Sequence, residues 1–186
     1  DGNDICEMGE RRLAKMRRRI GMLFQGAALF DSLTVKENVA YPLREHFEYS
    51  EDEISDIVSK KLEMVGLPGI EVMMPADISG GMKKRVGLAR AIATDPDVIL
   101  YDEPTTGLDP ANTKRICKLI TEMQEKLKVT SLVVTHDMEA AFSVTDRLAM
   151  IYNRKFDFVG TKEEAKSSAD PVVQNFIRGD METGDG

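Results

Sequence analysis

The fold of this chain is decided by the stretch Asp97-Val98-Ile99-Leu100-Tyr101-Asp102-Glu103-Pro104-Thr105-Thr106-Gly107-Leu108-Asp109-Pro110. Val98 to Tyr101 are bulky and mostly apolar without alternating polar residues, which predicts a parallel strand buried on both faces. Two carboxylates, Asp102 and Glu103, follow at once. Ligands of open α/β sheets bind beyond the carboxyl ends of the strands, so these acids could hold the metal of a polyphosphate and polarise an attacking water. A strand ending in a solvated acidic turn is the alternative.

Length and charge limit the class of protein. The chain has 186 residues, which suits one hydrophobic core, so a single domain over 1–186 is expected. A net charge of −7 argues against general affinity for nucleic acid or anionic membranes, because both require basic surface. We expect the one basic cluster to be solvated rather than to bind phosphate or lipid. It comprises Arg11, Arg12, Lys15, Arg17, Arg18 and Arg19.

Cysteine usage and hydropathy indicate the cellular compartment in which the protein is expected. Cys6 and Cys117 are far apart and outside any metal-ligand spacing, which favours reduced thiols in the cytosol. The sequence contains no apolar run long enough for a membrane span. Any association with a membrane is therefore expected to require a partner protein.

A second predicted strand, Ile20 to Phe24, delivers Gln25 to its carboxyl end. A glutamine side chain can both accept from and donate to a metal-bound water, so Gln25 is a candidate for the same crevice. An ordinary turn residue is the equal alternative. Residues 27–43 are unusually apolar for a connection and include a helix predicted over Val35 to Ala40. They form either a partner-binding surface or part of the domain's own core.

Ser79-Gly80-Gly81 precedes a helix predicted over Lys83 to Ala93. A serine N-cap followed by two glycines leaves free N–H groups at the positive end of the helix dipole, where an anion is favoured. The triplet alone is weak evidence, because many helices begin in this way. A capping box, Ser50 to Glu53, opens another helix that we expect to be structural.

The residues after the first strand predict a βαβ unit. An amphipathic helix over Pro110 to Lys128 is followed by a strand over Thr130 to Thr135, and such units are right-handed. The strand over Thr130 to Thr135 is followed directly by His136, which we expect to lie beside Asp102 and Glu103. A lone histidine is, however, more often structural. A hairpin (147–152 with 155–159) and a helix capped by Thr161 are predicted next.

These residues together resemble the ATP-binding cassette (ABC) ATPases, in order and approximate spacing, over essentially the whole chain. Ile78 to Met82 is similar to the signature motif, Val98 to Glu103 to the Walker B strand with its catalytic glutamate, and Gly107 to Asp109 to the D-loop. The resemblance implies an α/β P-loop NTPase fold with a mostly parallel sheet, an α-helical subdomain and a C-terminal hairpin. Its parts are expected at about 27–95 (helical and signature subdomain), 96–160 (catalytic core strands) and 161–186 (C-terminal helices and tail).

The resemblance also implies a role for each site residue. Two copies would close head to tail around ATP, with Ser79-Gly80-Gly81 of one copy contacting the ATP held by the other. Asp102 and Gln25 would bind Mg²⁺, and Glu103 would activate water. His136 would contact the γ-phosphate, and Asp109 would communicate across the homodimer.

Within the family, residues 22–35, 37–46 and 170–179 look most similar to the ATPase of the MCE-associated (Mla-type) phospholipid transporters, as does Met82 where most cassettes have glutamine. This implies ATP-driven lipid transport and a permease bound through residues 27–43, with MCE-domain and small regulatory subunits as further partners. The ATPase would be cytoplasmic and peripheral on the inner or plasma membrane. A cassette of another importer, such as one for polar amino acids, is the alternative.

One family motif is not found, because the sequence contains no Gly-Lys dipeptide for a P-loop (Walker A motif). Residues 1–5 resemble the segment that follows the P-loop helix. We therefore expect the chain to be incomplete at its N-terminus, inactive as an ATPase by itself and poorly stable, since its sheet would carry an unpaired edge. The alternative from a different class is a P-loop-less module that binds or regulates without hydrolysis.

Overall fold

A parallel sheet forms the centre of the first of two units in this computed structural model, which describes residues 2 and 4–179. Its three strands are β1 (Ile20–Leu23), β2 (Val98–Asp102) and β3 (Thr130–Val134), in the order β1-β2-β3. The register aligns Leu23 with Tyr101 and Tyr101 with Val133. The two predicted core strands and the strand that contributes Gln25 are therefore confirmed, and β2 runs one residue further than expected, to Asp102.

Helix α4 (Gly80–Ala91) lies against one face of this sheet. Two glycines permit the close approach: a Cβ on Gly21 would be 2.2 Å from the Ala91 carbonyl oxygen, and one on Gly87 would be 3.0 Å from Leu23 Cδ1. Along β2, buried residues alternate with half-buried ones. The prediction that this strand is buried on both faces is therefore wrong, because α4 covers only the face that carries Leu23 and Tyr101.

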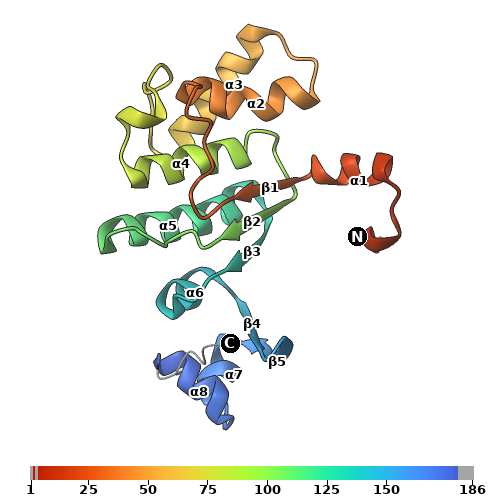
Figure 1. Cartoon of the computed structure of the whole chain (residues 1–186), viewed down its shortest axis with the longest axis vertical. Helices are drawn as coiled ribbons and strands as arrows, with labels where there is room; N and C mark the ends of the chain where they lie inside the picture. Colours follow the sequence, from red (N-terminus) through yellow and green to blue (C-terminus); the bar gives the residue numbers. More distant parts are fainter. Residues whose placement is uncertain (1, 3, 180–186) are drawn as a thin grey trace. The chain divides into compact units, whose positions relative to one another are not determined.

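The other helices of the first unit (Asp1–Thr135) extend this helical layer. Helices α2 (Val35–His46) and α3 (Glu51–Met64) pack on α4, which lies between them and the sheet (Figure 1). Each begins with a complete capping box, formed by Thr34 with Glu37 and by Ser50 with Glu53. Helix α2 is longer than predicted, and α5 (Pro110–Leu127) joins β2 to β3 as the sequence predicts.

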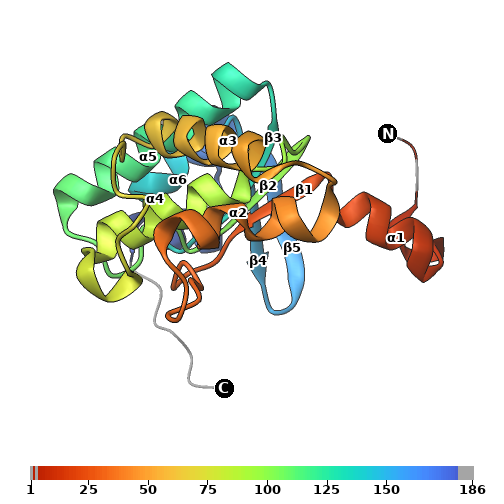
Figure 2. The same cartoon turned by 90° about the horizontal axis from the view of Figure 1, so that it is seen from above.

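The basic cluster near the N-terminus forms a helix, α1 (Glu10–Arg17), which the sequence did not predict. No residue of α1 is buried, in agreement with the expected solvated role. It extends away from the rest of the first unit (Figure 2). Two short 3-10 helices, η1 (Ile5–Glu7) and η2 (Pro75–Asp77), complete this unit.

The second unit, His136–Gly186, contains the predicted hairpin. Strands β4 (Arg147–Tyr152) and β5 (Lys155–Thr161) pair antiparallel, with a register shift between Met150 and Ile151. Its helices are α6 (Met138–Val144), α7 (Lys162–Ser167) and α8 (Pro171–Arg178). Thr161 and Glu164 form the predicted capping box at the start of α7. No helix within the described ranges is long and apolar enough to cross a membrane.

Candidate functional site

The carboxyl ends of the three parallel strands bring several of the predicted site residues to one edge of the sheet. Gln25 follows β1 by two residues, Asp102 ends β2, and Glu103 comes directly after it. The Glu103 N–H donates to the Val134 carbonyl oxygen at 2.9 Å, so the pairing with β3 continues beyond Asp102. The structure thus places Gln25, Asp102 and Glu103 where the sheet topology predicted them.

Glu103 is held in an unusual backbone conformation. Its φ of 45° lies in the left-handed region, which costs an ordinary residue about 1–2 kcal/mol. Its Oε2 accepts a hydrogen bond from Thr106 Oγ1 at 2.9 Å and a longer one from Thr135 Oγ1 at 3.4 Å. A strained residue fixed by several contacts is typical of functional sites, because the surrounding structure has to impose the conformation.

Helix α4 begins at the predicted serine cap but three residues earlier than predicted. Ser79 is the N-cap, and its Oγ accepts from the Met82 N–H at 3.2 Å. Gly80 and Gly81 are therefore the first helical residues rather than a loop, because the cap satisfies the helix end in spite of their low helix propensity. Their N–H groups remain at the positive end of the helix, as an anion site requires.

Lys84, one turn into α4, was not anticipated as a site residue. Its side chain is buried, with 5% of the residue exposed, and its Nζ donates to the carbonyl oxygens of Glu103 at 3.0 Å and Pro104 at 2.9 Å. Burial lowers the pKa of Lys84, and the negative charge of Glu103 partly opposes that shift. The available signal was its helical spacing from Leu88 and Ala91, which places a lysine on the apolar face of the helix.

Asp109 caps the N-terminus of α5 and is tied to the start of α4. Its Oδ1 accepts from the N–H groups of Ala111 and Asn112, both at 3.0 Å, and its Oδ2 accepts from the Asn112 side chain. These donors lower the pKa of Asp109, those of Asn112 most strongly. Asn112 also contacts Gly81, where a Cβ would be 2.7 Å from its Oδ1. Asn112, which the sequence did not suggest, thus links two predicted site segments.

His136 is the first residue of the second unit and directly follows Thr135. The βαβ unit that leads to it is present, since β2 and β3 are parallel neighbours joined by α5. Its position beside Asp102 and Glu103 stays a prediction.

The residues at the sheet edge suit Mg²⁺ and a polyphosphate in their donor chemistry. Among residues 2 and 4–179, no group of three or more His, Cys, Asp or Glu side chains could hold a metal ion. Mg²⁺ does not require such a group, because it is usually held by one or two carboxylates together with water and substrate phosphates. Asp102 and Gln25 offer only oxygen ligands, and the first turn of α4 offers backbone donors to an anion.

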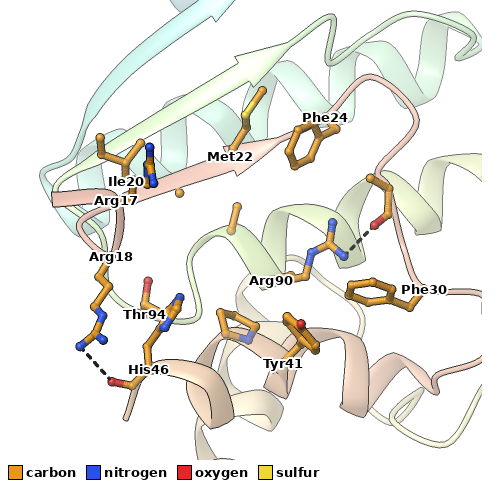
Figure 3. Close-up of a pocket in the computed structure, with 14 residues that line it drawn as sticks. Arg17, Arg18, Ile20, Met22, Phe24, Phe30, Tyr41, His46, Arg90 and Thr94 are labelled. Carbon is orange, nitrogen blue, oxygen red and sulfur yellow. Dashed lines mark hydrogen bonds between the residues drawn. The ribbon is translucent and has the colours of Figure 1, made fainter. Parts of the chain in front are cut away.

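A second feature of the first unit is a groove of about 460 Å³ beside β1 (Figure 3). Apolar and aromatic side chains line much of it, including Met22, Phe30 and Tyr41. The ring centroids of Phe30 and Tyr41 are 4.9 Å apart, and the two residues are 44% and 43% exposed. Arg17 and Arg18 lie at one end of the groove. Residues 27–43 therefore supply exposed groove surface as well as buried core residues, namely Ala27, Val35, Val39, Ala40 and Leu43.

Arg90 of α4 shapes the loop that follows Gln25. Its guanidinium donates to the carbonyl oxygens of Ala27 at 2.7 Å and Ala28 at 2.8 Å, and it lies 5.9 Å from the centre of the Phe30 ring. Ala27 and Ala28 both have positive φ, at 62° and 47°. Helix α4 thus contacts the loops at the carboxyl ends of two strands, through Arg90 after β1 and through Lys84 after β2.

Comparisons with known proteins agree with this architecture. Residues 1–106 match the family described as ABC transporter. The chain is 46% identical to the intermembrane phospholipid transport system ATP-binding protein MlaF of Haemophilus influenzae, over 98% of this chain and 69% of that protein. It is 44% identical to the probable ribonucleotide transport ATP-binding protein mkl of Mycobacterium tuberculosis, over 96% of this chain but only 50% of that protein.

A solved structure shares the fold. It is a dimeric post-hydrolysis state of the ATP-binding cassette MJ0796 bound to ADP and Pi, 31% identical with a TM-score of 0.74, matching 83% of this chain and 68% of that one. Sequence motifs, sheet topology and relatives agree, and the chain belongs to the ABC transporter family, among its ATP-binding subunits.

Proposed function

We propose that the protein that contains this chain hydrolyses ATP to drive phospholipid transport through a membrane permease. The observation that carries the proposal is the setting of Glu103, which stands in a fixed, strained conformation at the carboxyl end of β2. A carboxylate there, next to Asp102, suits the activation of a water that attacks a phosphoryl group. Catalysis of this kind depends mainly on positioning and charge stabilisation, so scattered loops on one sheet edge suffice.

Each site residue then has one task. Glu103 orients and deprotonates water, and its Oε2 is steadied by Thr106. Asp102 and Gln25 would hold Mg²⁺, which would supply positive charge against the phosphates. His136 contacts the γ-phosphate.

Two copies are proposed to assemble head to tail around ATP. Ser79, Gly80 and Gly81 of one copy bind the phosphates held by the other, and Asp109 signals across the interface. The packing of Asn112 between Gly81 and Asp109 supports this joint role, because it couples the two interface segments within one copy. The relative MJ0796 was solved as a dimer with ADP and Pi.

The permease is proposed to dock in the groove beside β1. Exposed aromatic residues such as Phe30 and Tyr41 suit the apolar side of a helix from a membrane protein. The groove borders the loop that contains Gln25, because Phe24 and Ala28 line it. A permease bound there would therefore contact the chain next to the proposed Mg²⁺ site. The ATPase would accordingly be peripheral on the cytoplasmic face of the membrane, with MCE-domain and small regulatory subunits as further partners.

Phospholipid is the favoured cargo because the MlaF relative, at 46% identity, is named for intermembrane phospholipid transport. The name of the mkl relative, at 44% identity, favours ribonucleotides as the second candidate. The ATPase reconstituted in vesicles together with its permease and MCE-domain subunits should move phospholipid between vesicles in an ATP-dependent manner. ATP-dependent uptake of ribonucleotides without lipid transfer would select the second candidate instead.

Hydrolysis is tested by Glu103→Gln in the full protein encoded by the gene. The amide keeps the size of the side chain but cannot take a proton from water, so turnover should fall by about 100-fold or more while ATP stays bound. Glu125→Gln, an exposed change on α5, is the matched control and should leave turnover intact. Full turnover in Glu103→Gln would remove Glu103 from this role, and an inactive wild-type protein would favour a non-catalytic module.

A further inference from the structure

Lys84 and the Glu103 loop are joined by a buried, charged contact. The ammonium group donates to two successive carbonyl oxygens, those of Glu103 and Pro104, at 3.0 and 2.9 Å. The Glu103 carbonyl also accepts the Thr106 N–H at 3.3 Å, which closes the turn after β2. Lys84 therefore binds the turn through its backbone carbonyl oxygens, starting at Glu103, the residue whose backbone is strained.

A lysine is a costly choice for a purely structural role at this position. Its residue is 5% exposed, and removing an ammonium group from water is unfavourable unless its interactions compensate. An apolar residue of similar length would pack against Leu88 and the rest of the buried face of α4 without that cost. What it could not do is donate hydrogen bonds to the two carbonyl oxygens of the turn that carries the Glu103 side chain.

The contact also has a defined place in the fold. Lys84 lies five residues after Ser79, in the first turns of the helix that begins with Gly80 and Gly81. Helix α4 is continuous from Gly80 to Ala91, so a displacement of its first turn would be carried to Lys84 by the helix backbone. Its side chain would pass the displacement to the backbone of Glu103.

We propose that Lys84 is a positioning residue for ATP hydrolysis, which fixes the Glu103 carboxylate by bonding the backbone of its turn and ties it to the phosphate-binding start of α4. The proposal rests on the proposed role of Glu103 as the residue that activates water. It predicts that loss of the Lys84 contact impairs the chemical step rather than the binding of ATP, because the Lys84 ammonium group is engaged by the backbone of the Glu103 turn.

The test uses the full protein with Lys84→Met, which keeps the length of the side chain and removes the donor, and with Lys84→Gln, which keeps a donor without the charge. Lys83→Met, at the neighbouring half-buried lysine of α4, is the matched control. Steady-state kcat and KM for ATP are measured together with thermal unfolding. Lys84→Met should lower kcat by about 10-fold or more and change KM by less than about twofold. Lys84→Gln should be intermediate, and Lys83→Met should resemble the wild type.

A second measurement separates positioning from general destabilisation. In a Glu103→Gln background, Lys84→Met should reduce the residual single-turnover rate by less than about twofold. Substitutions of residues that act as a unit do not have additive effects, and the carboxylate that Lys84 positions is already lost. The same factor of loss in both backgrounds would overturn the proposal, and so would an unchanged kcat in both Lys84 variants. If Lys84→Met does not yield folded protein, the kcat of Lys84→Gln decides in the same way.

The outcomes also distinguish this proposal from the proposed function. If Glu103→Gln itself leaves turnover unchanged, the role of Glu103 fails, whatever Lys84 does. If Glu103→Gln abolishes turnover while the Lys84 variants keep their kcat, only the positioning role of Lys84 fails.

Discussion

Gly81 of α4 and Asn112 of α5 lie so close together that a Cβ on Gly81 would be 2.7 Å from Asn112 Oδ1 and 2.9 Å from its Cγ. The Asn112 side chain is itself bonded to Asp109, so it has little freedom to withdraw. The glycine at position 81 is therefore required by packing against α5, whereas a Cβ on Gly80 would meet nothing within 4 Å.

Gly81→Ala should therefore destabilise the protein, and Gly80→Ala should not. The new methyl group at position 81 has to displace Asn112, which we expect to lower the free energy of unfolding by about 1–3 kcal/mol. The matched change at position 80 adds a better helix former in open space and should leave stability the same or raise it by up to about 1 kcal/mol. Denaturant unfolding of the two variants measures the difference, and equal stabilities would contradict the packing argument.

Asp109 should titrate below its ordinary pKa of 3.8. Its carboxylate is hydrogen-bonded in the folded state, so the ionised form contributes stability above the unfolded pKa, and this contribution is lost as the pH falls through the lowered folded pKa. Carbon-detected NMR of the aspartate carboxyl group checks the value. In Asn112→Ala the pKa of Asp109 should rise towards 3.8 but stay below it, because backbone donors remain; an unchanged pKa would show that the Asn112 side chain is not a donor.

Arg90→Met should loosen the loop after Gln25. It removes two charge-assisted hydrogen bonds, to Ala27 and Ala28, and we expect the free energy of unfolding to fall by about 2 kcal/mol. Amide hydrogen exchange should become faster over residues 26–30, because positive φ at two alanines then lacks its support. Arg12→Met, on the exposed helix α1, is the control. Unchanged exchange in the Arg90 variant would mean that the loop holds its conformation without the guanidinium.

Asn38 should be among the most sensitive polar positions of the helical layer. It is fully buried, accepts from the Phe30 N–H at 2.8 Å and donates to the carbonyl oxygens of Phe30, Leu33 and Thr34 at 3.0–3.1 Å. Asn38→Leu keeps the volume but leaves these part-buried backbone groups without their partner, so the free energy of unfolding should fall by about 3 kcal/mol. Glu45→Ala, exposed on the same helix, should change stability by less than about 0.5 kcal/mol. A comparable loss in both variants would refute the assigned role.

The strands and helices of the first unit were largely predictable, because their signals are local. The apolar runs that became β1, β2 and β3 stop at polar residues, and the capping box at Ser50 marks a helix start in the sequence itself, as the one at Thr161 does in the second unit. The sequence predicts the start of α4 three residues too late, because the glycines at 80 and 81 disfavour a helix unless a cap and a neighbouring helix compensate. The predicted burial of β2 on both faces is also wrong, because an apolar run does not show how many layers cover a strand.

What the sequence by itself determined is the identity and order of the chemical groups: Gln25, the Ser79 helix start, Asp102 and Glu103, each at an element end that local patterning sets. Only the tertiary structure decided how they are held. Lys84, Arg90 and Asn112 act through contacts between residues far apart in the chain, and no local pattern names the partners of such contacts, although helical spacing does place Lys84 on the apolar face of its helix. Their side chains find their partners only after the packing of α4 on the sheet and on α5 has brought distant backbone carbonyls within reach.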